Sequence, residues 1–477
     1  MNREPELLAY ELSRTGRIGT VLPKSDVPET SLPSGMLRQD LPLPELDELT
    51  VVRHFTRLSQ KNFSIDTQYY PLGSCTMKYN PKANEAAAGM GGWKNSHPLV
   101  GEEFSQGSLE LMYNLQETLA KIGGFTAVSL QPAAGAHGEL AGVLMIRAYH
   151  ESRGDKKRTK MLIPDSAHGT NPATSTMAGM TVETIPSDAD GDIDLNALRS
   201  ACDDTVAGIM ITNPNTLGLF EKNIREIAEI VHKAGGLVYG DGANLNAITG
   251  VLRPADVGID VMHFNLHKTF STPHGGGGPG VGIVGAGVTL ANFLPGPVVA
   301  KKGAKFALEM PSKGIGRLKV FYGNFGVLVR AYAYVRMVGE DGLRRIAENA
   351  VLNANYLKAR LEKIYPVPHK RSCMHEFVAR GDFIEGIHTL DIAKRLIDYG
   401  MHPPTIYFPL IVPEAIMVEP TETESKETLD LFVDIMTKIA EEAKTNPELL
   451  HDAPHDTPVG RLDEVAAARN PILCYKN

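Results

Sequence analysis

Short apolar runs alternate with amphipathic helical stretches through the middle of this 477-residue chain, and this alternation restricts its fold more than any other feature. One such stretch, residues 221–234, carries Ile224, Ile227 and Val231 at helical spacing and ends at a pair of glycines. Four runs have the length and composition of buried strands: 160–164, 208–212, 237–240 and 260–264. Strands separated by helices of this length predict a largely parallel sheet in an α/β fold.

Periodicity and composition divide the chain into three segments. Residues 1–95 are rich in proline and turn residues, and they predict an extended arm that packs on another surface. Residues 96–335 hold the alternating strands and helices, which predict one large domain. Residues 336–477 are richer in helix and predict a smaller α+β domain.

Charge and composition argue against several classes of protein. The net charge of −8 comes without a long run of Lys or Arg, so nucleic acid is not an expected partner. No stretch is as long and apolar as a membrane span, and Met1–Arg14 lacks the apolar core of a signal peptide. The four cysteines lie far apart without CxxC spacing, which predicts reduced thiols and a cytoplasmic location.

Lys268 gives the strongest local signal for chemistry. It follows a predicted buried strand, in the string HKTFSTPHGGGGPG at 267–280. Desolvation at such a place favours the nucleophilic amine, and the glycines let backbone approach a ligand closely. An isolated lysine of this kind is more often a surface residue before a flexible turn. The neighbouring strand ends favour the catalytic interpretation.

Asp241 and Asn213 stand at the ends of two other predicted strands. Asn213 lies 28 residues before Asp241, and Lys268 lies 27 residues after it. Because parallel strands end at one edge of the sheet, where such folds bind ligands, the three side chains should converge. A carboxylate at this edge can hold the protonated ring nitrogen of pyridoxal phosphate (PLP), which makes the ring an electron sink. Taken alone, Asp241 is equally well explained as a cap on the next turn.

Two further segments fit the same cofactor. The string SAHGTNP at 166–172 puts the imidazole of His168 where it could stack on the pyridine ring. Gly135 and Ala136 open a helix whose first backbone N–H groups could hold a phosphate. Each feature alone is weak evidence, because a lone histidine often caps a turn and many helices begin at glycine.

Three competing motif interpretations fail. GVGIVG at 280–285 matches the dinucleotide pattern GxGxxG, but it lies in an apolar β-like run that no helix follows. His274 and the glycines after it resemble an esterase oxyanion loop, yet the chain has no GxSxG sequence. His263, His267 and His274 could suggest a metal site, but Lys268 among them would repel a cation. No metal site is predicted.

Several longer strings are similar to one known family, the P-protein of the glycine cleavage system. The strings are TQYYPLGSCTMKYNP (67–81), QPAAGAHGELAG (131–142), LIPDSAHGTNPA (162–173), GDGANLNA (240–247), NLHKTFSTPHGGGGPG (265–280) and MVEPTETESKETLD (417–430). The similarity runs from about residue 60 to 435. The chain resembles the cofactor-bearing half of the long single-chain form, which is subunit 2 of the split form.

This resemblance implies a fold-type-I PLP-dependent transferase fold, with a mainly parallel seven-stranded sheet and a smaller α+β domain. It also implies decarboxylation of glycine and transfer of the aminomethyl group to the lipoyl arm of H-protein. Lys268 would form the Schiff base with PLP, Asp241 would hold the pyridinium and His168 would stack on the ring. These three residues form the predicted catalytic set.

The predicted cofactor-binding set is larger. The resemblance places Gly135, Ala136 and His267 near the phosphate, and the strand-end residues Asn213 and Ala243 complete the set.

The resemblance also implies the partners, and the family's other half, which this sequence does not show, implies a second subunit. The predicted partners are glycine, lipoylated H-protein and a homologous subunit 1, in an assembly with two of each chain. The resemblance also brings Gly323 near the cofactor of a neighbouring chain. Ser74 and Thr76 are candidates for hydrogen bonds on the substrate side, and plain turn residues would explain them equally well.

Two other function classes stay open at this point. Another fold-type-I PLP enzyme, such as an amino-acid decarboxylase or a desulfurase, could share a strand-end Asp and Lys. A desulfurase needs a mobile catalytic cysteine, and only Cys75 lies in a suitable segment. A non-catalytic scaffold half is the weakest alternative, because a scaffold has no reason to keep Lys268, Asp241 and His168 together.

Overall fold

The computed structural model describes residues 5–38, 40–275, 278, 280–320, 322 and 324–474. Gly323 and part of the glycine-rich string (276, 277 and 279) lie outside the described residues. The chain divides into two compact units, one formed by Met1–Gln68 with Asp452–Asn477 and the other by Tyr69–His451. The segment boundaries at residues 95 and 335 stay predictions.

The first unit contains few regular elements. They are α1 (Ala9–Leu12), the 3-10 turn η1 (Ser34–Met36), α2 (Glu48–Gln60) and α14 (Glu464–Arg469). Asp47 caps α2, because its carboxylate accepts the Thr50 N–H at 2.8 Å. Throughout the described ranges, no helix is both long enough and apolar enough to cross a membrane.

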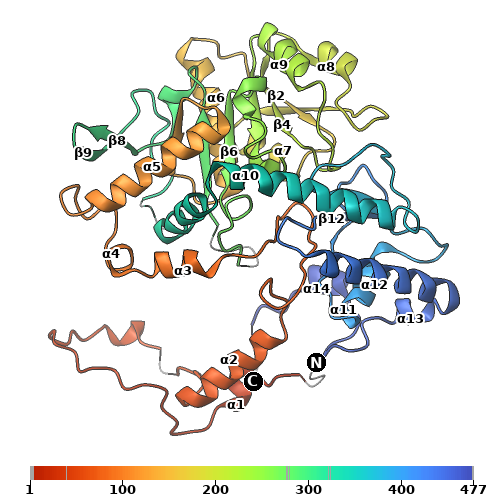
Figure 1. Cartoon of the computed structure of the whole chain (residues 1–477). Coiled ribbons are helices and arrows are strands. Elements are labelled where there is room, and N and C mark those ends of the chain that lie inside the picture. The colour runs from red at the N-terminus through yellow and green to blue at the C-terminus, as the bar shows by residue number, and fades with distance from the viewer. Residues whose placement is uncertain are drawn as a thin grey trace. The chain divides into compact units, whose positions relative to one another are not determined.

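The second unit is built around a seven-stranded sheet (Figure 1) with the order β1-β7-β6-β5-β4-β2-β3. Its strands are β1 (Ala127–Ser129), β2 (Lys160–Pro164), β3 (Thr181–Ile185), β4 (Val206–Thr212), β5 (Leu237–Asp241), β6 (Val261–Asn265) and β7 (Gly282–Ala286). β7 runs antiparallel to β1 and β6, and the other neighbouring strands are parallel. The predicted, mainly parallel α/β sheet is confirmed.

Helices cover both faces of this sheet because successive strand residues point to opposite sides. Ile209 and Val238 pack in one core with α5 (Gln106–Gly123) and α9 (Ile224–Lys233), whereas Met210 and Tyr239 pack in another with α6 (Gly135–Ser152). The helices and turns of this region are α3 (Lys82–Ala88), α4 (Gly91–Lys94), α5 (Gln106–Gly123), α6 (Gly135–Ser152), α7 (Thr170–Met177), α8 (Leu195–Ala201), α9 (Ile224–Lys233), η2 (Gly242–Ala247), η3 (Pro254–Val257) and η4 (Ala291–Phe293). The same region also contains a separate two-stranded hairpin of β8 (Val298–Lys302) and β9 (Lys305–Glu309).

A smaller antiparallel sheet forms the rest of the second unit. Its order is β10 (Phe377–Arg380), β12 (Ala415–Val418) and β11 (Thr405–Ile406). The helices α11 (Thr389–Asp398), α12 (Lys426–Thr445) and α13 (Glu448–His451) accompany it. This region is the smaller α+β part of the predicted fold class.

Helix α10 (Phe325–Leu361) joins the two sheets of this unit (Figure 1). Its first half packs in the core of the large sheet, and Leu357 and Leu361 pack in the core of the small one. Gly339, at φ 66°, interrupts the helix within the part that packs on the large sheet, since Leu343 and Ile346 beyond it still lie in that core. A residue with a side chain would be strained there.

Candidate active site at the carboxyl edge of the large sheet

A cavity of about 320 Å³ lies at the carboxyl ends of β5 and β6 and next to the first turn of α6. Seven of the eight predicted site residues line it: Gly135, Ala136, His168, Asp241, Ala243, His267 and Lys268. The other lining residues are Ser74, Cys75, Ala134, Glu139, Thr170, His263, Asn265, His274, Gly278 and Gly280. The strand ends therefore collect these polar groups at one edge, as the parallel order predicts.

Asn213 is the eighth predicted site residue, and it is not one of the described residues that line this cavity. It follows β4, and its side-chain Oδ1 accepts the backbone N–H of Glu221 at 3.0 Å. Its contact thus fixes the turn after β4.

Lys268 lies three residues beyond the end of β6, in a turn closed by its N–H to the carbonyl of Asn265 at 3.1 Å. Its side chain is buried, with 9% exposed. The Nζ donates to the backbone carbonyl of Ser74 at 2.6 Å. This hydrogen bond holds the amine at the wall of the cavity.

Asp241 is the last residue of β5, and hydrogen-bond donors surround its carboxylate. Oδ1 accepts the Ala243 N–H at 2.9 Å, Oδ2 accepts the Asn171 Nδ2 at 3.2 Å, and His263 Nε2 lies 3.6 Å from Oδ1. Burial acts to raise the pKa of Asp241, but His263 and the two hydrogen bonds outweigh it and hold the pKa below its ordinary value. The carboxylate stays ionised, which a pyridinium partner requires.

Glu139 provides a second carboxyl group in the cavity wall, beside Asp241, and the sequence reasoning did not single it out. Its Oε1 accepts the other hydrogen bond of Asn171 Nδ2, at 2.6 Å, so one amide bridges Glu139 and Asp241. Burial and the charge of Asp241 raise the pKa of Glu139 to about 7. One feature of the sequence could have identified Glu139. It is a glutamate one turn into α6, after Gly135, and it lies among residues that are buried.

His168 lines the cavity between two other side chains. Its Nε2 lies 2.6 Å from the Ser74 Oγ, and its ring stacks on Phe408 with centroids 4.6 Å apart and planes at 29°. Burial lowers the pKa of His168, so the imidazole is neutral near pH 7. A neutral, oriented ring is suited to stacking on a planar cofactor.

The backbone at Gly135, where α6 begins, lies too close to its neighbours for a side chain at that position. A Cβ on Gly135 would lie 2.4 Å from Asn265 Oδ1, and one on Gly282 would lie 2.0 Å from the Ala134 carbonyl. The N-terminus of this 18-residue helix is suited to an anion. His267 Nδ1 is buried there and has no hydrogen-bond partner in the described part of the chain.

This donor set fits PLP. The helix N-terminus matches a phosphate, the ionised Asp241 matches a ring nitrogen, and the Lys268 amine matches an aldehyde. Burial, then the charge of Lys268, lowers the pKa of His267 to about 3, so this ring is neutral and its free Nδ1 can bond a ligand.

The segment 72–78, called the Ser74 loop below, brings unusual backbone to the cavity. Ser74 and Thr76 have φ values of 64° and 46°, in the left-handed region. Such a conformation costs about 1–3 kcal/mol per residue and persists only where the surroundings enforce it. Ser74 contacts both Lys268 and His168, so the alternative that treated this residue as a plain turn does not describe its contacts.

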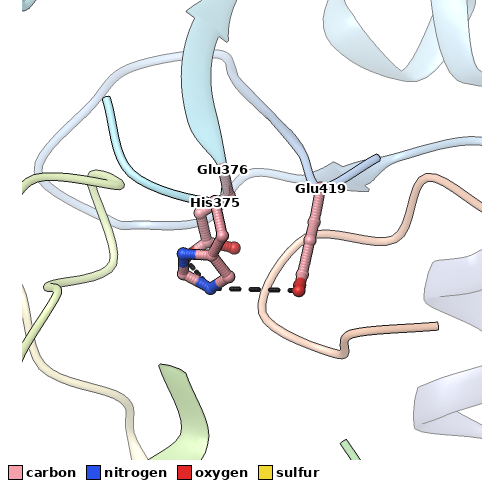
Figure 2. A group of neighbouring side chains, drawn as sticks. All are labelled: His375, Glu376 and Glu419. Carbon is pink, nitrogen blue, oxygen red and sulfur yellow. Dashed lines mark ion pairs between the residues drawn. The ribbon is translucent and has the colours of Figure 1, made fainter. Parts of the chain in front are cut away.

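Two buried carboxyl groups enforce this conformation. Glu376 Oε2 accepts the Ser74 N–H at 2.7 Å, and Glu419 Oε2 accepts the Thr76 N–H at 2.8 Å. Figure 2 shows both glutamates beside His375, whose Nε2 lies 3.9 Å from one carboxyl oxygen of each. Sequence reasoning missed all three residues, although Glu419 lies inside a string used for the family resemblance.

Comparison with known proteins assigns the chain to a family. The profile described as "Glycine cleavage system P-protein" matches residues 22–310, which is more than half of the chain. The profile "Glycine dehydrogenase, C-terminal domain" matches residues 346–455.

This chain belongs to the P-protein family of the glycine cleavage system.

Relatives in this family match the chain from end to end. A protein of Caldanaerobacter subterraneus named "Probable glycine dehydrogenase (decarboxylating) subunit 2" is 57% identical over 99% of both chains. A protein of Alkaliphilus oremlandii with the same name is 56% identical over 100% of this chain and 99% of its own.

Solved structures share the fold at lower identity. A glycine decarboxylase (P-protein) in inhibitor-bound form matches with a TM-score of 0.74 and 22% identity, over 86% of this chain and 93% of its own. A cysteine desulfurase from Thermococcus onnurineus matches with a TM-score of 0.62 and 16% identity, over 79% and 95%. The fold-type-I architecture predicted from the sequence is confirmed.

Proposed function

We propose that this chain is the PLP-bearing subunit of a glycine decarboxylase that transfers the remaining aminomethyl group to the lipoyl arm of H-protein. The observation that carries the proposal is that Lys268, Asp241 and His168 line one cavity in a member of the P-protein family. The reaction breaks the bond between Cα and the carboxylate of glycine and releases CO₂. A carbon–sulfur bond then forms as the lipoyl disulfide is reduced, so no nicotinamide site is needed.

When bound, PLP supplies the electron sink for the carbanion that loss of CO₂ leaves. Lys268 anchors the cofactor through its amine, which the Ser74 carbonyl holds at the cavity wall. Asp241 keeps a proton on the ring nitrogen, because its own pKa is held low by His263 and by hydrogen bonds. His168 orients the ring by stacking.

The cavity walls contribute to the same step by limiting solvent. Asp241, His263 and Lys268 are all buried, with 9% or less exposed. In such an environment the field of a fixed carboxylate acts more strongly on a developing charge than it would in water.

A desulfurase is not favoured as an alternative. Cys75 does line the cavity, so the one cysteine singled out for that chemistry is in reach. However, burial raises the pKa of its thiol above the ordinary value, which disfavours the nucleophilic thiolate. The desulfurase fold match has 16% identity, whereas the full-length relatives named glycine dehydrogenase subunit 2 reach 57%.

The chain works, in this proposal, with a homologous subunit 1, in a cytoplasmic assembly with two copies of each. The name of the relatives, subunit 2, supports a second subunit. Exposed apolar side chains of the first unit, including Ile18, Val21, Leu22 and Met36, are suited to covering by another chain. Co-expression should give one complex in size exclusion, and a fully active homomer of this chain alone would contradict the arrangement.

An isotope-exchange assay tests the reaction itself. Purified chain with PLP is mixed with glycine, labelled CO₂ and lipoylated H-protein, with and without subunit 1. We expect label to enter the glycine carboxyl group only in the complete mixture, and Lys268→Ala should abolish the exchange. Exchange at the same rate without H-protein would contradict the proposal. Release of sulfur from cysteine by the complete mixture would contradict it as well.

A further inference from the structure

The cluster of His375, Glu376 and Glu419 lies beside the ends of two paired strands of the small sheet. Phe377 of β10 pairs with Val418 of β12, so Glu376 and Glu419 each lie one residue beyond this pair. All three side chains of the cluster have 0% exposure (Figure 2). Buried carboxyl groups are costly unless polar partners compensate them, so their partners indicate what they do.

Their partners lie in the Ser74 loop. Glu376 accepts the Ser74 N–H, and Glu419 accepts both the N–H and, at 2.5 Å, the hydroxyl of Thr76. The loop is also fastened to β12, where Leu72 bridges to Val418. The small sheet therefore fixes both residues of the loop that have left-handed backbone.

The same loop reaches the cavity through one residue. Ser74 offers its carbonyl to Lys268 Nζ and its hydroxyl to His168 Nε2, both at 2.6 Å, while Glu376 holds its N–H. Every polar group of Ser74 is thereby committed, and a shift of this residue would break its contacts with Lys268 and His168 together.

We propose that Glu376 and Glu419 are positioning residues, which aim Lys268 and His168 by clamping the Ser74 loop. The inference rests on the proposed roles of Lys268 and His168, but not on the identity of the substrate. It gives the small sheet a part in the chemistry of the large one, because two glutamates at the strand ends of the small sheet set the orientation of the cavity wall.

The cluster also has the donor atoms of a metal site, with ligand atoms within 4.8 Å of one another. Two observations favour the clamp instead. A metal-binding imidazole normally donates its second ring N–H to a carbonyl or carboxylate, but His375 Nδ1 has no hydrogen-bond partner among the described residues. Moreover, both Glu419 oxygens and Glu376 Oε2 already accept hydrogen bonds from the loop.

The test measures how fast Lys268 of the full chain without cofactor reacts with a small acylating reagent, read by peptide mass spectrometry. Glu376→Ala and Glu419→Ala free the loop and remove the Ser74 carbonyl from Nζ. We expect Lys268 to react about tenfold faster, which corresponds to the free energy of one lost hydrogen bond. This readout does not require activity, so it can fail independently of the proposed function.

Glu221→Ala is the matched control. Glu221 is also buried and accepts two backbone N–H groups, from Ile193 and Asn223, but it does not line the cavity. Its loss should lower thermal stability and leave the acylation rate of Lys268 unchanged. Glu376→Gln and Glu419→Gln keep an acceptor oxygen, and we expect them to restore most of the protection.

The proposal is overturned if the two Ala variants acylate no faster than Glu221→Ala, or if the Gln variants protect no better than Ala. Should the Ala variants not fold, Thr76→Ala removes only the hydroxyl bond to Glu419 and should raise the rate about threefold, roughly half the free energy of one such bond. An unchanged rate in Thr76→Ala would then overturn it. One equivalent of a divalent ion in the purified chain, retained through dialysis and lost in the Gln variants, would also overturn it.

Discussion

The carboxyl edge of the large sheet and the Ser74 loop both form the wall of one cavity, but they reach it by different means. Asp241 and Lys268 follow adjacent parallel strands, so sheet order alone brings them together. Ser74 is held by a carboxyl group 302 residues away in the chain, and Thr76 by one 343 residues away. The difference teaches that strand topology collects the reactive groups, while long-range side-chain contacts orient them.

If the strand ends carry the chemistry, Asp241→Asn should have the largest effect among variants that keep Lys268. A neutral amide cannot hold the ring nitrogen protonated, so isotope exchange should fall about 10²-fold or more, while PLP still binds. Asp391→Asn is the control, since Asp391 is also buried and accepts a backbone N–H, from His388, but caps α11. Exchange by Asp241→Asn at the rate of this control would remove Asp241 from the mechanism.

Glu139→Gln tests whether the same edge holds a proton near pH 7. The pKa of the Glu139 carboxyl rises from 4.5 to about 7 in the fold, chiefly through burial and then through Asp241. The raised pKa contributes stability below pH 4.5 that is lost as pH rises through 7, at most roughly 3 kcal/mol at ~1.4 kcal/mol per unit.

Glu139→Gln keeps an acceptor for Asn171 and cannot ionise. The fall in the free energy of unfolding between pH 5 and 8 should therefore be shallower in this variant than in the parent. Chemical denaturation across this range measures it, and identical slopes in both proteins would show that Glu139 does not titrate there.

His168→Ala compares the two regions directly, because His168 contacts Ser74 and lines the cavity. Lost stacking should weaken PLP retention by up to about tenfold, the upper end of the ~0.5–1.5 kcal/mol that one aromatic pair contributes. His150→Ala is the control, a buried histidine on α6 bonded to the Ala207 carbonyl. Equal cofactor loss in both variants, measured by dialysis and absorbance, would assign the effect to stability.

The smallest effect is expected at Asn213. Its side chain bonds the Glu221 N–H and does not line the cavity among the described residues. Asn213→Ala should lower the melting temperature by a few degrees, the consequence of about 1 kcal/mol of lost hydrogen bonding. PLP affinity should stay within about twofold of the parent, a change of ~0.4 kcal/mol. A larger loss of affinity would restore the role in cofactor binding that its strand-end position suggested.

Sequence reasoning predicted the large sheet because its strands and helices are regular, and regular periodicity is visible in a single chain. The positions of Asp241, Lys268 and His168 followed from the same regularity, since Asp241 ends β5 and the other two lie a few residues beyond β6 and β2. Strand-end position was also the reason for including Asn213, whose side chain turns to the Glu221 N–H instead. A position at a strand end fixes the backbone, but not the direction of the side chain.

The remaining groups gave no periodic signal. Glu139 differs from an ordinary helix residue only through burial beside Asp241, and Glu376 and Glu419 matter only because a distant loop donates to them. The left-handed backbone of Ser74 was equally invisible, because φ values of non-glycine residues depend on their surroundings.

The central claim is that Lys268 is the amine that holds PLP, and one measurement tests it most directly. The chain is loaded with PLP, reduced with borohydride and digested, and the modified peptide is identified by mass spectrometry. The account predicts the adduct on Lys268, in the peptide that contains HKTF. An adduct on Lys78, which is buried and bonded to Glu422, or on the exposed Lys301, would contradict it.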